Sequence, residues 1–328
     1  MKLNRDEMIG KRIDIHMHHG IMLSSLFDDK TPFCQNMSGI IDSLKECDLD
    51  YGVVFPFPNN FIGNDILSDQ RQNECVRNIF EKTPYLIQNM RLIDEAGKLA
   101  KNRVLPVPMF SIKYCVDEQL SFLNEQVKNG AVYGLKFYPE ADGVPIRELR
   151  NAGTPFLGFL SENNLPLFIH VSAESVVANS LLSRPEDAYM LAADYPKLRV
   201  CIAHMGHFSK VLFSWLKENT LKNCYMDTSP FLHICNVRKL SPSENCFAFD
   251  YESPSDVLSQ LIDMFPNNIV WGSDNPFNFT CNLHNENHDK NIDKHSILEY
   301  SRLLHSLPVG QLQQITSVNS LNLLFGEK

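Results

Sequence analysis

The sequence predicts an α/β fold, a (β/α)8 TIM barrel with extended loops on its C-terminal face, formed by residues 1–328 as a single domain. Eight short apolar runs alternate with longer amphipathic segments, which is the pattern of successive βα units. The units recur every roughly 25 to 50 residues, a spacing that suits this barrel better than a doubly wound sheet. The chain is also long enough, because such a barrel takes about 250 residues before insertions.

The eight predicted strands are short and apolar, and several of them end in a polar residue. They cover residues 12–18, 52–57, 103–110, 132–138, 166–171, 199–204, 223–229 and 268–273. The segments between them repeat apolar residues with helical spacing. We expect helices at 39–49, 69–102, 117–129, 151–164, 187–195, 209–219, 255–265 and 295–305, and a last helix near 309–325 that closes the barrel.

Three segments are longer than a simple connection. Residues 19–38, 230–254 and 275–294 follow the first, seventh and eighth predicted strands. They leave the C-terminal ends of strands, the face on which barrel active sites form. We expect at least one of them to cover the site; the alternative is that all three are mobile insertions.

Composition excludes several classes of function. Hydrophobic residues make up 44% and charged residues 21% of the chain, and the net charge is −9, which argues against a nucleic-acid or anionic-membrane partner. Nine scattered cysteines without a C-x-x-C pair argue against a disulfide framework or a cysteine zinc site. Residues 1–11 lack the apolar core of a signal peptide, so we expect a cytoplasmic protein. The sequence is compatible with a homo-oligomer but gives no direct sign of one.

His16 and His18 form a His-x-His pair on the first predicted strand. Side chains at positions i and i+2 point to the same face of a strand, so both imidazoles converge at the end of the strand. Neutral imidazole is a preferred ligand of zinc-like ions. The alternative is an exposed, histidine-rich strand end, since His19 follows directly.

Other candidate ligands fall at equivalent strand ends. His170 ends the fifth apolar run, His204 ends the sixth, and Asp274 follows the eighth. Barrel closure places the first and eighth strands side by side, which would bring Asp274 to the histidine pair. Asp274 could instead cap the turn that follows it. Metal-ligand residues at four separate strand ends nevertheless favour a metal site.

The ordered motifs resemble the amidohydrolase superfamily, specifically the amidohydrolase-2 branch of metal-dependent hydrolases with a TIM-barrel fold. The matching stretches run through almost the whole chain: Asp14-Ile15-His16-Met17-His18, Gly134-Leu135-Lys136-Phe137-Tyr138-Pro139, Leu165-Pro166-Leu167-Phe168-Ile169-His170, Ala203-His204-Met205-Gly206, Tyr225-Met226-Asp227-Thr228-Ser229, Gly272-Ser273-Asp274-Asn275-Pro276 and Asn319-Ser320-Leu321-Asn322-Leu323-Leu324-Phe325.

The resemblance implies roles for these residues. His16, His18 and Asp274 would bind the more buried divalent metal, zinc being the first choice, and Asp274 would also take a proton from water. His170 would be a further ligand. His204 would either bind a second metal or polarise the substrate. One or two ions are therefore expected.

Lys136 is expected to face the barrel interior with Tyr138, where an unpaired cation is costly. It could pair with a carboxylate or with an anionic substrate. The resemblance offers another role, because dihydroorotases carry a similar lysine that carbon dioxide converts into a carbamate bridging two metals. A charged lysine near the metal is the preferred interpretation.

The remaining histidines are weaker candidates. His207 stands where relatives carry a small residue and could enter the pocket, although a surface position at the start of a helix is slightly favoured. His19 and His233 have less support. A polar stretch contains three more histidines that we expect to be solvated: His284, His288 and His295.

The predicted function is hydrolysis of an amide, lactone or ester bond in a small molecule. A metal-dependent decarboxylase is the alternative, because decarboxylases resemble the same branch and share its ligands. A barrel that binds a ligand without catalysis is a third hypothesis. The presence of Asp274 beside the histidine pair argues against it, because a binding protein has no need of a water-activating carboxylate. The sequence contains no nucleophile elbow, P-loop or dinucleotide-binding glycine motif.

Overall fold

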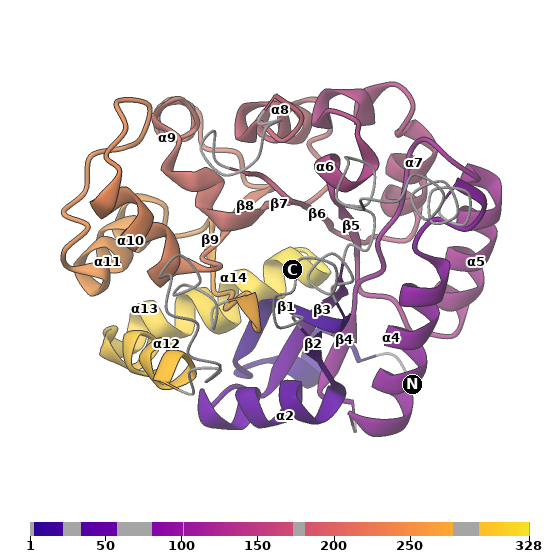
Figure 1. The fold of residues 1–328 in the computed structure, drawn as a ribbon, viewed down its shortest axis with the longest axis horizontal. Helices are drawn as coiled ribbons and strands as arrows, with labels where there is room; N and C mark the ends of the chain where they lie inside the picture. The colour runs from indigo at the N-terminus through magenta and orange to yellow at the C-terminus, as the bar shows by residue number, and fades with distance from the viewer. Residues whose placement is uncertain are drawn as a thin grey trace, which may run out of the picture.

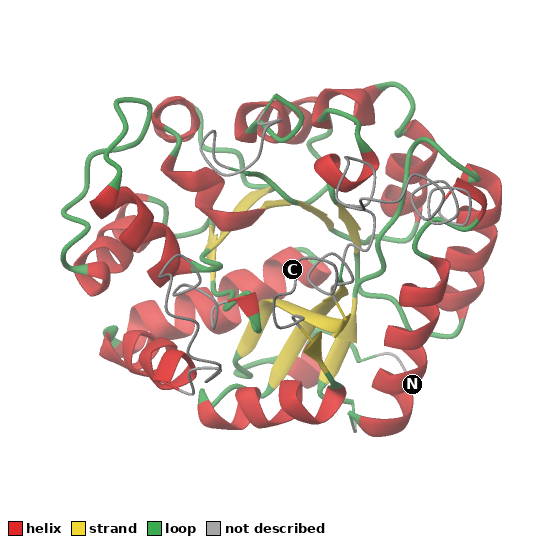
Figure 2. Ribbon diagram, in the orientation of Figure 1, coloured by secondary structure: helices red, strands yellow, loops and turns green. Residues whose placement is uncertain are grey.

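The strands form a ring enclosed by helices, as Figures 1 and 2 show. The computed structural model describes residues 3–21, 34–57, 81–100, 102–172, 181–277 and 295–327. Its strands are β1 (Ile13–Ile21), β2 (Cys34–Gln35), β3 (Tyr51–Pro56), β4 (Val104–Pro106), β5 (Leu135–Phe137), β6 (Leu167–Ile169), β7 (Val200–Ile202), β8 (Cys224–Asp227) and β9 (Ile269–Val270). Each of the eight predicted runs therefore contains a strand.

Backbone hydrogen bonds close the ring. All neighbouring strands pair in parallel except β2, which pairs antiparallel with the end of β1. The two sheets, β2-β1-β3-β4 and β5-β6-β7-β8-β9, meet at two seams. At one seam the Lys136 amide donates to Pro108 O at 2.9 Å, and at the other the Ile15 amide donates to Trp271 O at 2.8 Å. The predicted (β/α)8 barrel is confirmed.

Helices surround the strands, and several of them begin with local signals typical of helix N-termini. They are η1 (Asp6–Met8), α2 (Met37–Glu46), α4 (Leu86–Leu99), α5 (Val116–Lys128), α6 (Pro139–Asp142), η3 (Ile146–Arg150), α7 (Thr154–Glu162), α8 (Pro185–Asp194), η4 (Ala203–Phe208), α9 (Lys210–Glu218), α10 (Phe231–Leu240), α11 (Pro254–Met264), α12 (His295–Ser306), α13 (Val309–Gln313), η6 (Gln314–Val318) and α14 (Asn319–Phe325). Proline opens α6, α8 and α11, where its missing amide hydrogen costs nothing. Asn36 caps α2, and Ser209 caps α9.

The structure describes different fractions of the three long segments predicted after the first, seventh and eighth strands. β1 continues to Ile21 and β2 pairs with it, so two strand segments occupy the ends of the stretch at 19–38. α10 lies in the stretch at 230–254, where no helix was predicted. Residues 278–294 and 58–80 lie outside the described residues, as do His284 and His288. Among the described residues, no helix combines the length and apolar character that a membrane-spanning segment requires.

Alternating side chains build two hydrophobic layers. Phe168, Cys201 and Tyr225 lie side by side in the cluster inside the barrel, because strand pairing sets them at the same level. Their neighbours along each strand, including Leu167 and Ile202, belong to the cluster between strands and helices. Residues of α14 join the inner cluster and close it. Four cysteines are buried and act as small hydrophobic residues: Cys47, Cys201, Cys224 and Cys235.

The buried carboxyl group of Asp142 gives the scaffold an expected pH dependence. It accepts a hydrogen bond from the Ile112 amide at 3.0 Å, and burial raises its pKa to about 6. Because the folded chain holds this proton more tightly, wild-type stability should fall as pH rises between about 4 and 6. Asp142→Asn removes that penalty, up to about 3 kcal/mol. Urea unfolding at about pH 5 and about pH 8 measures it; a difference between variant and wild type that does not grow with pH would contradict the assignment.

Candidate metal centre

β1 presents two histidines to the barrel interior because the strand carries a β-bulge. The pairing of β1 with β3 shifts between Asp14 and Met17, which inserts one extra residue in β1. A bulge of this kind changes which side chains face the core. Ile15 still belongs to the inner cluster, whereas Met17 belongs to the outer one. His16 and His18 are both buried, and both rings lie against Phe55 inside the barrel.

Side-chain atoms of His16, His18 and Asp274, residues from opposite ends of the chain, converge inside the barrel. The Nε2 atoms of His16 and His18 lie 3.2 Å apart. Asp274 Oδ1 lies 3.2 Å from the first of these nitrogens and 3.1 Å from the second. Asp274 follows β9 with a left-handed backbone (φ 61°), and its amide donates to His16 O at 2.8 Å. The predicted meeting of the first and last strands therefore brings these three residues together.

The spacing of these atoms suits a bound cation. Two ligand nitrogens on a tetrahedral zinc ion, each about 2.0–2.1 Å from it, are about 3.3 Å apart. The three donor atoms of His16, His18 and Asp274 match that spacing, and all three side chains are buried. Two ring nitrogens and a carboxylate oxygen in mutual contact need a proton or a cation between them. The donor set therefore fits a divalent metal.

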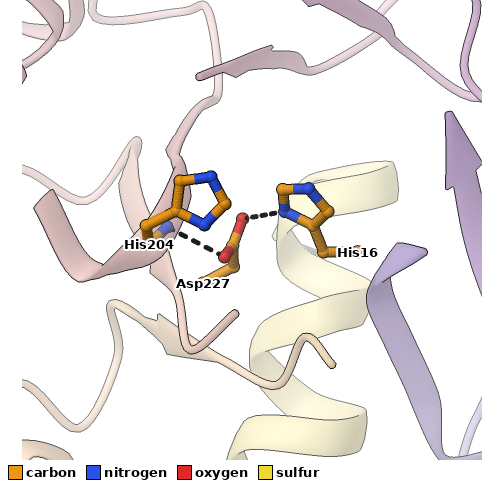
Figure 3. A group of neighbouring side chains, drawn as sticks. All are labelled: His16, His204 and Asp227. Carbon is orange, nitrogen blue, oxygen red and sulfur yellow. Dashed lines mark hydrogen bonds and ion pairs between the residues drawn. The ribbon is translucent and has the colours of Figure 1, made fainter. Parts of the chain in front are cut away.

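Asp227 holds the first histidine in place, a role that sequence reasoning did not assign to it. Its Oδ2 lies 2.9 Å from His16 Nδ1, and its Oδ1 accepts the His204 amide at 3.1 Å. Figure 3 shows the carboxylate between the two histidines. A carboxylate accepts the Nδ1 proton, which leaves the Nε2 lone pair of His16 for a ligand bond. His16, His204 and Asp227 also form a second group of close ligand atoms.

His204 is fixed in one tautomer by the chain after β8. Its Nδ1 lies 2.7 Å from the Ser229 carbonyl oxygen, which can only accept a hydrogen bond. The proton of a neutral ring is therefore on Nδ1, and Nε2 carries a lone pair. That Nε2 lies 3.0 Å from Nδ1 of His170.

His170 joins His204 and not the first cluster. Its ring stacks on Tyr138, with centroids 3.9 Å apart and an interplanar angle of 12°. Its Nε2 lies 3.0 Å from Ser172 Oγ. Among the described residues, His170 belongs to neither group of three close ligand atoms. The two histidines at the ends of β6 and β7 thus form a second pair beside the first cluster.

Lys136 lies inside the barrel, as the sequence predicts. Its side chain is buried, with Nζ 4.6 Å from the centre of the Phe55 ring. Nζ has no hydrogen-bond partner within the described part of the chain. Burial lowers the pKa of this amine, and the charges of Asp227 and Asp274 oppose that shift. The lysine is therefore close enough to both carboxylates for electrostatic interaction without pairing with either.

Burial favours the neutral form of three imidazoles of the centre. It lowers the pKa of His16, His170 and His204 well below the ordinary histidine value, and the neighbouring histidines and Lys136 act in the same direction. Burial also raises the pKa of Asp274, against the influence of His18. Neutral rings with free lone pairs are the form that binds a metal.

The weaker histidine candidates lie in different surroundings. His19 is buried but turns away from the cluster, with Nε2 2.8 Å from Glu95 Oε2. His207 is half-buried, and its ring centroid lies 5.6 Å from that of His204. The slightly favoured surface position for His207 is therefore wrong, because the turn after β7 folds the side chain back against the site.

Asp227→Asn should weaken metal binding by about 10- to 100-fold, the usual cost of losing a partner that orients a ligand. The amide nitrogen would face a donor, since Asp227 accepts from His16 Nδ1, the His204 amide and Ser229. Competition with a chelator measures the dissociation constant. Asp142→Asn is the control, because it replaces a buried carboxylate that lies outside the cluster. Equal metal affinity in the Asp227 variant and the control would contradict this role.

Comparison with known families gives one match that covers more than half of the chain. A family model described as Amidohydrolase matches residues 89–311. The matched part includes the ends of β5 to β9, whereas His16 and His18 precede it. No curated protein matches the chain.

Solved structures share the fold over nearly the whole chain. An uncharacterized TIM-barrel protein from Bordetella bronchiseptica has a TM-score of 0.60 at 12% identity, covering 96% of this chain and 98% of that one. An IDCase from Metarhizium anisopliae, in apo form, has a TM-score of 0.54 at 14% identity, covering 97% and 98%. A dihydroorotase from Campylobacter jejuni has a TM-score of 0.49 at 15% identity, covering 95% and 82%. At these identities the likeness to the first two structures establishes the fold and not the reaction.

Proposed function

The chain belongs to the amidohydrolase family, and on this premise we propose that it is a metal-dependent hydrolase that cleaves an amide, lactone or ester bond in a small molecule. One observation carries the proposal. Two histidine nitrogens and a carboxylate oxygen, all buried, converge within 3.2 Å at the C-terminal face of the barrel. Metal-assisted hydrolysis requires such a ligand set with a base beside it.

We assign His16, His18 and Asp274 to the first metal and the pair His170 and His204 to the second. Zinc is the first choice, because neutral imidazoles dominate the donor set and zinc prefers nitrogen ligands. The tautomer of His204 supports a ligand role over substrate polarisation. With its proton directed at the Ser229 carbonyl, a neutral ring offers a lone pair at Nε2 and has no proton there to donate.

The residues then divide the work of hydrolysis. A divalent metal bound here would act as a Lewis acid and make water reactive near neutral pH. The Asp274 carboxylate takes the proton that the attacking water loses. It later returns that proton to the leaving group. Asp227 keeps His16 oriented throughout.

Lys136 has two proposed states. Its unpaired, buried Nζ supports carboxylation, in which the neutral amine attacks carbon dioxide and releases a proton to give a carbamate. A charged lysine that contacts the substrate is the other state.

Metal stoichiometry separates these states of Lys136. Carboxylation predicts two metals per chain in the presence of bicarbonate and one in Lys136→Ala, because the carbamate is the bridge that holds the second ion. Elemental analysis of the purified protein, with and without bicarbonate, measures this number. One tightly held metal per chain under all three conditions would eliminate the carbamate and leave a structural or substrate-binding charge.

The hydrolase proposal is tested against its alternatives with a substrate panel. The metal-loaded protein is assayed with lactones and amides beside aromatic carboxylic acids, in water labelled with heavy oxygen. Incorporation of label into the product supports hydrolysis. Release of carbon dioxide without incorporation would replace the proposal with a decarboxylase, and metal binding without turnover of either class would indicate a binding protein.

A further inference from the structure

The segment after β7 adopts a left-handed turn that most residues avoid. The five successive residues from His204 to Phe208 all have φ between 51° and 60°. For a residue other than glycine this conformation costs about 1–2 kcal/mol. Only Gly206 adopts it freely, and a side chain at that position would also collide with Leu212. Strain of this kind persists at functional sites where the surroundings fix the backbone.

Contacts from two other segments fix this turn. The His207 carbonyl oxygen accepts a hydrogen bond from Arg238 Nη2 at 3.2 Å and from Cys246 Sγ at 3.7 Å. The Phe247 amide donates to Phe208 O at 2.8 Å. α10 and the segment that follows it therefore hold the backbone of η4 in place. The turn is rigid enough to aim its side chains.

The turn directs His207 toward the second histidine pair. The ring of His207 lies beside that of His204, and its Nε2 lies 3.2 Å from the carbonyl oxygen of Val171, the residue after His170. A charge on His207 would act on both His170 and His204. The ring is half-buried, and its Nδ1 makes no hydrogen bond with any residue that the structure describes.

The hydrogen bond to Val171 decides which nitrogen of His207 carries the proton. A carbonyl oxygen only accepts, so the hydrogen is on Nε2, and a neutral ring then has a lone pair on Nδ1. The neutral ring therefore presents one oriented hydrogen-bond acceptor, at Nδ1.

We propose that His207 is a specificity-determining residue whose Nδ1 accepts a hydrogen bond from an N–H group of the substrate. The substrate class is then an amide that keeps an N–H beside its carbonyl, such as a cyclic amide. Lactones, esters and N-alkylated amides have no such donor. This inference rests on the proposed function for the position of the substrate, since the acceptor stands beside the pair assigned to the second metal.

The test compares ligands that differ in this single group. δ-Valerolactam carries the N–H, δ-valerolactone replaces it with oxygen, and N-methyl-δ-valerolactam blocks it. Calorimetry measures binding of each to the metal-loaded wild-type protein, and water incorporation is followed separately. We expect the lactam to bind up to about tenfold more tightly than either analogue, the effect of one hydrogen bond.

Two variants connect this preference to His207. His207→Phe keeps an aromatic ring but removes the acceptor, and it should bind all three ligands with equal affinity. His207→Gln keeps a donor for Val171 and an acceptor, and it should retain the preference for the lactam. Metal content and thermal unfolding confirm that each variant folds and is loaded. If the Phe variant fails to fold, the wild-type ligand series and the Gln variant still decide the question.

The outcomes separate the inference from the hydrolase proposal. Equal binding of lactam and lactone by the wild type, or no binding of the lactam, would overturn the role of His207. A lactam preference that survives in His207→Phe would overturn it as well. Lactam-selective binding that depends on His207, without water incorporation into any lactone or amide of the panel, would uphold the acceptor and remove the hydrolase proposal.

Discussion

Asp274→Asn is expected to lower kcat by about 10²- to 10⁴-fold, the range in which a general base contributes to catalysis. The amide has the shape of the carboxylate and retains an oxygen that can face His16 and His18, but it cannot take a proton from water. The backbone contact of Asp274 with His16 O is independent of the side chain. Fold and ligand geometry should therefore survive while turnover is lost.

Steady-state kinetics with the best substrate of the panel, together with urea unfolding and metal analysis, measure this effect. Asp142→Asn is the matched control, because it neutralises a buried carboxyl group that contacts Ile112 and not the cluster. Its turnover should stay close to wild type. A metal-loaded Asp274→Asn enzyme with near wild-type turnover would show that Asp274 is no catalytic base.

Replacing both His16 and His18 with alanine should remove most of the bound metal. The double variant deletes two of the three donor atoms that converge within 3.2 Å, and a single carboxylate oxygen holds a divalent ion weakly in competition with water. The metal content of protein dialysed against metal-free buffer measures the loss, and turnover should fall with it.

His19→Ala is the control for this experiment. It removes a buried histidine from the same strand, but one that contacts Glu95 instead of the cluster. Metal content should be unchanged in the control. Unchanged stoichiometry in the double variant would rule out His16 and His18 as ligands.

The fold could be predicted because its signals are local. Each strand is a short apolar run, and the polar residue that ends it is visible in the sequence, as with His170 and Asp274. Closing eight such units into a ring is then a property of the architecture, so the meeting of the first and last strands follows without further information. The side-by-side placement of His16 and Asp274 was predictable for the same reason.

The rest of the site depends on features that no local pattern reveals. The bulge in β1 shifts which side chains face inward, and nothing between Asp14 and Met17 marks the extra residue. Asp227 contacts the His16 ring from a strand 211 positions away and the backbone amide of His204 after the neighbouring strand, so its role appears only in three dimensions. The left-handed turn that contains His207 has a single glycine, Gly206, as its signal. A helix start at that position was therefore a reasonable reading of the sequence.

The seam between β1 and the segment after β9 determines when the candidate metal centre of His16, His18 and Asp274 can form. Its ligands are 256 positions apart along the chain, and they meet only through the last closing contacts of the ring. While Asp274 is still inside the ribosome, the ligand set is incomplete, so metal binding would be a late event in biogenesis. An ion that binds only when this seam is formed would stabilise the closed barrel by mass action. Such an ion would stabilise the junction between the first strand and the segment that follows the last one.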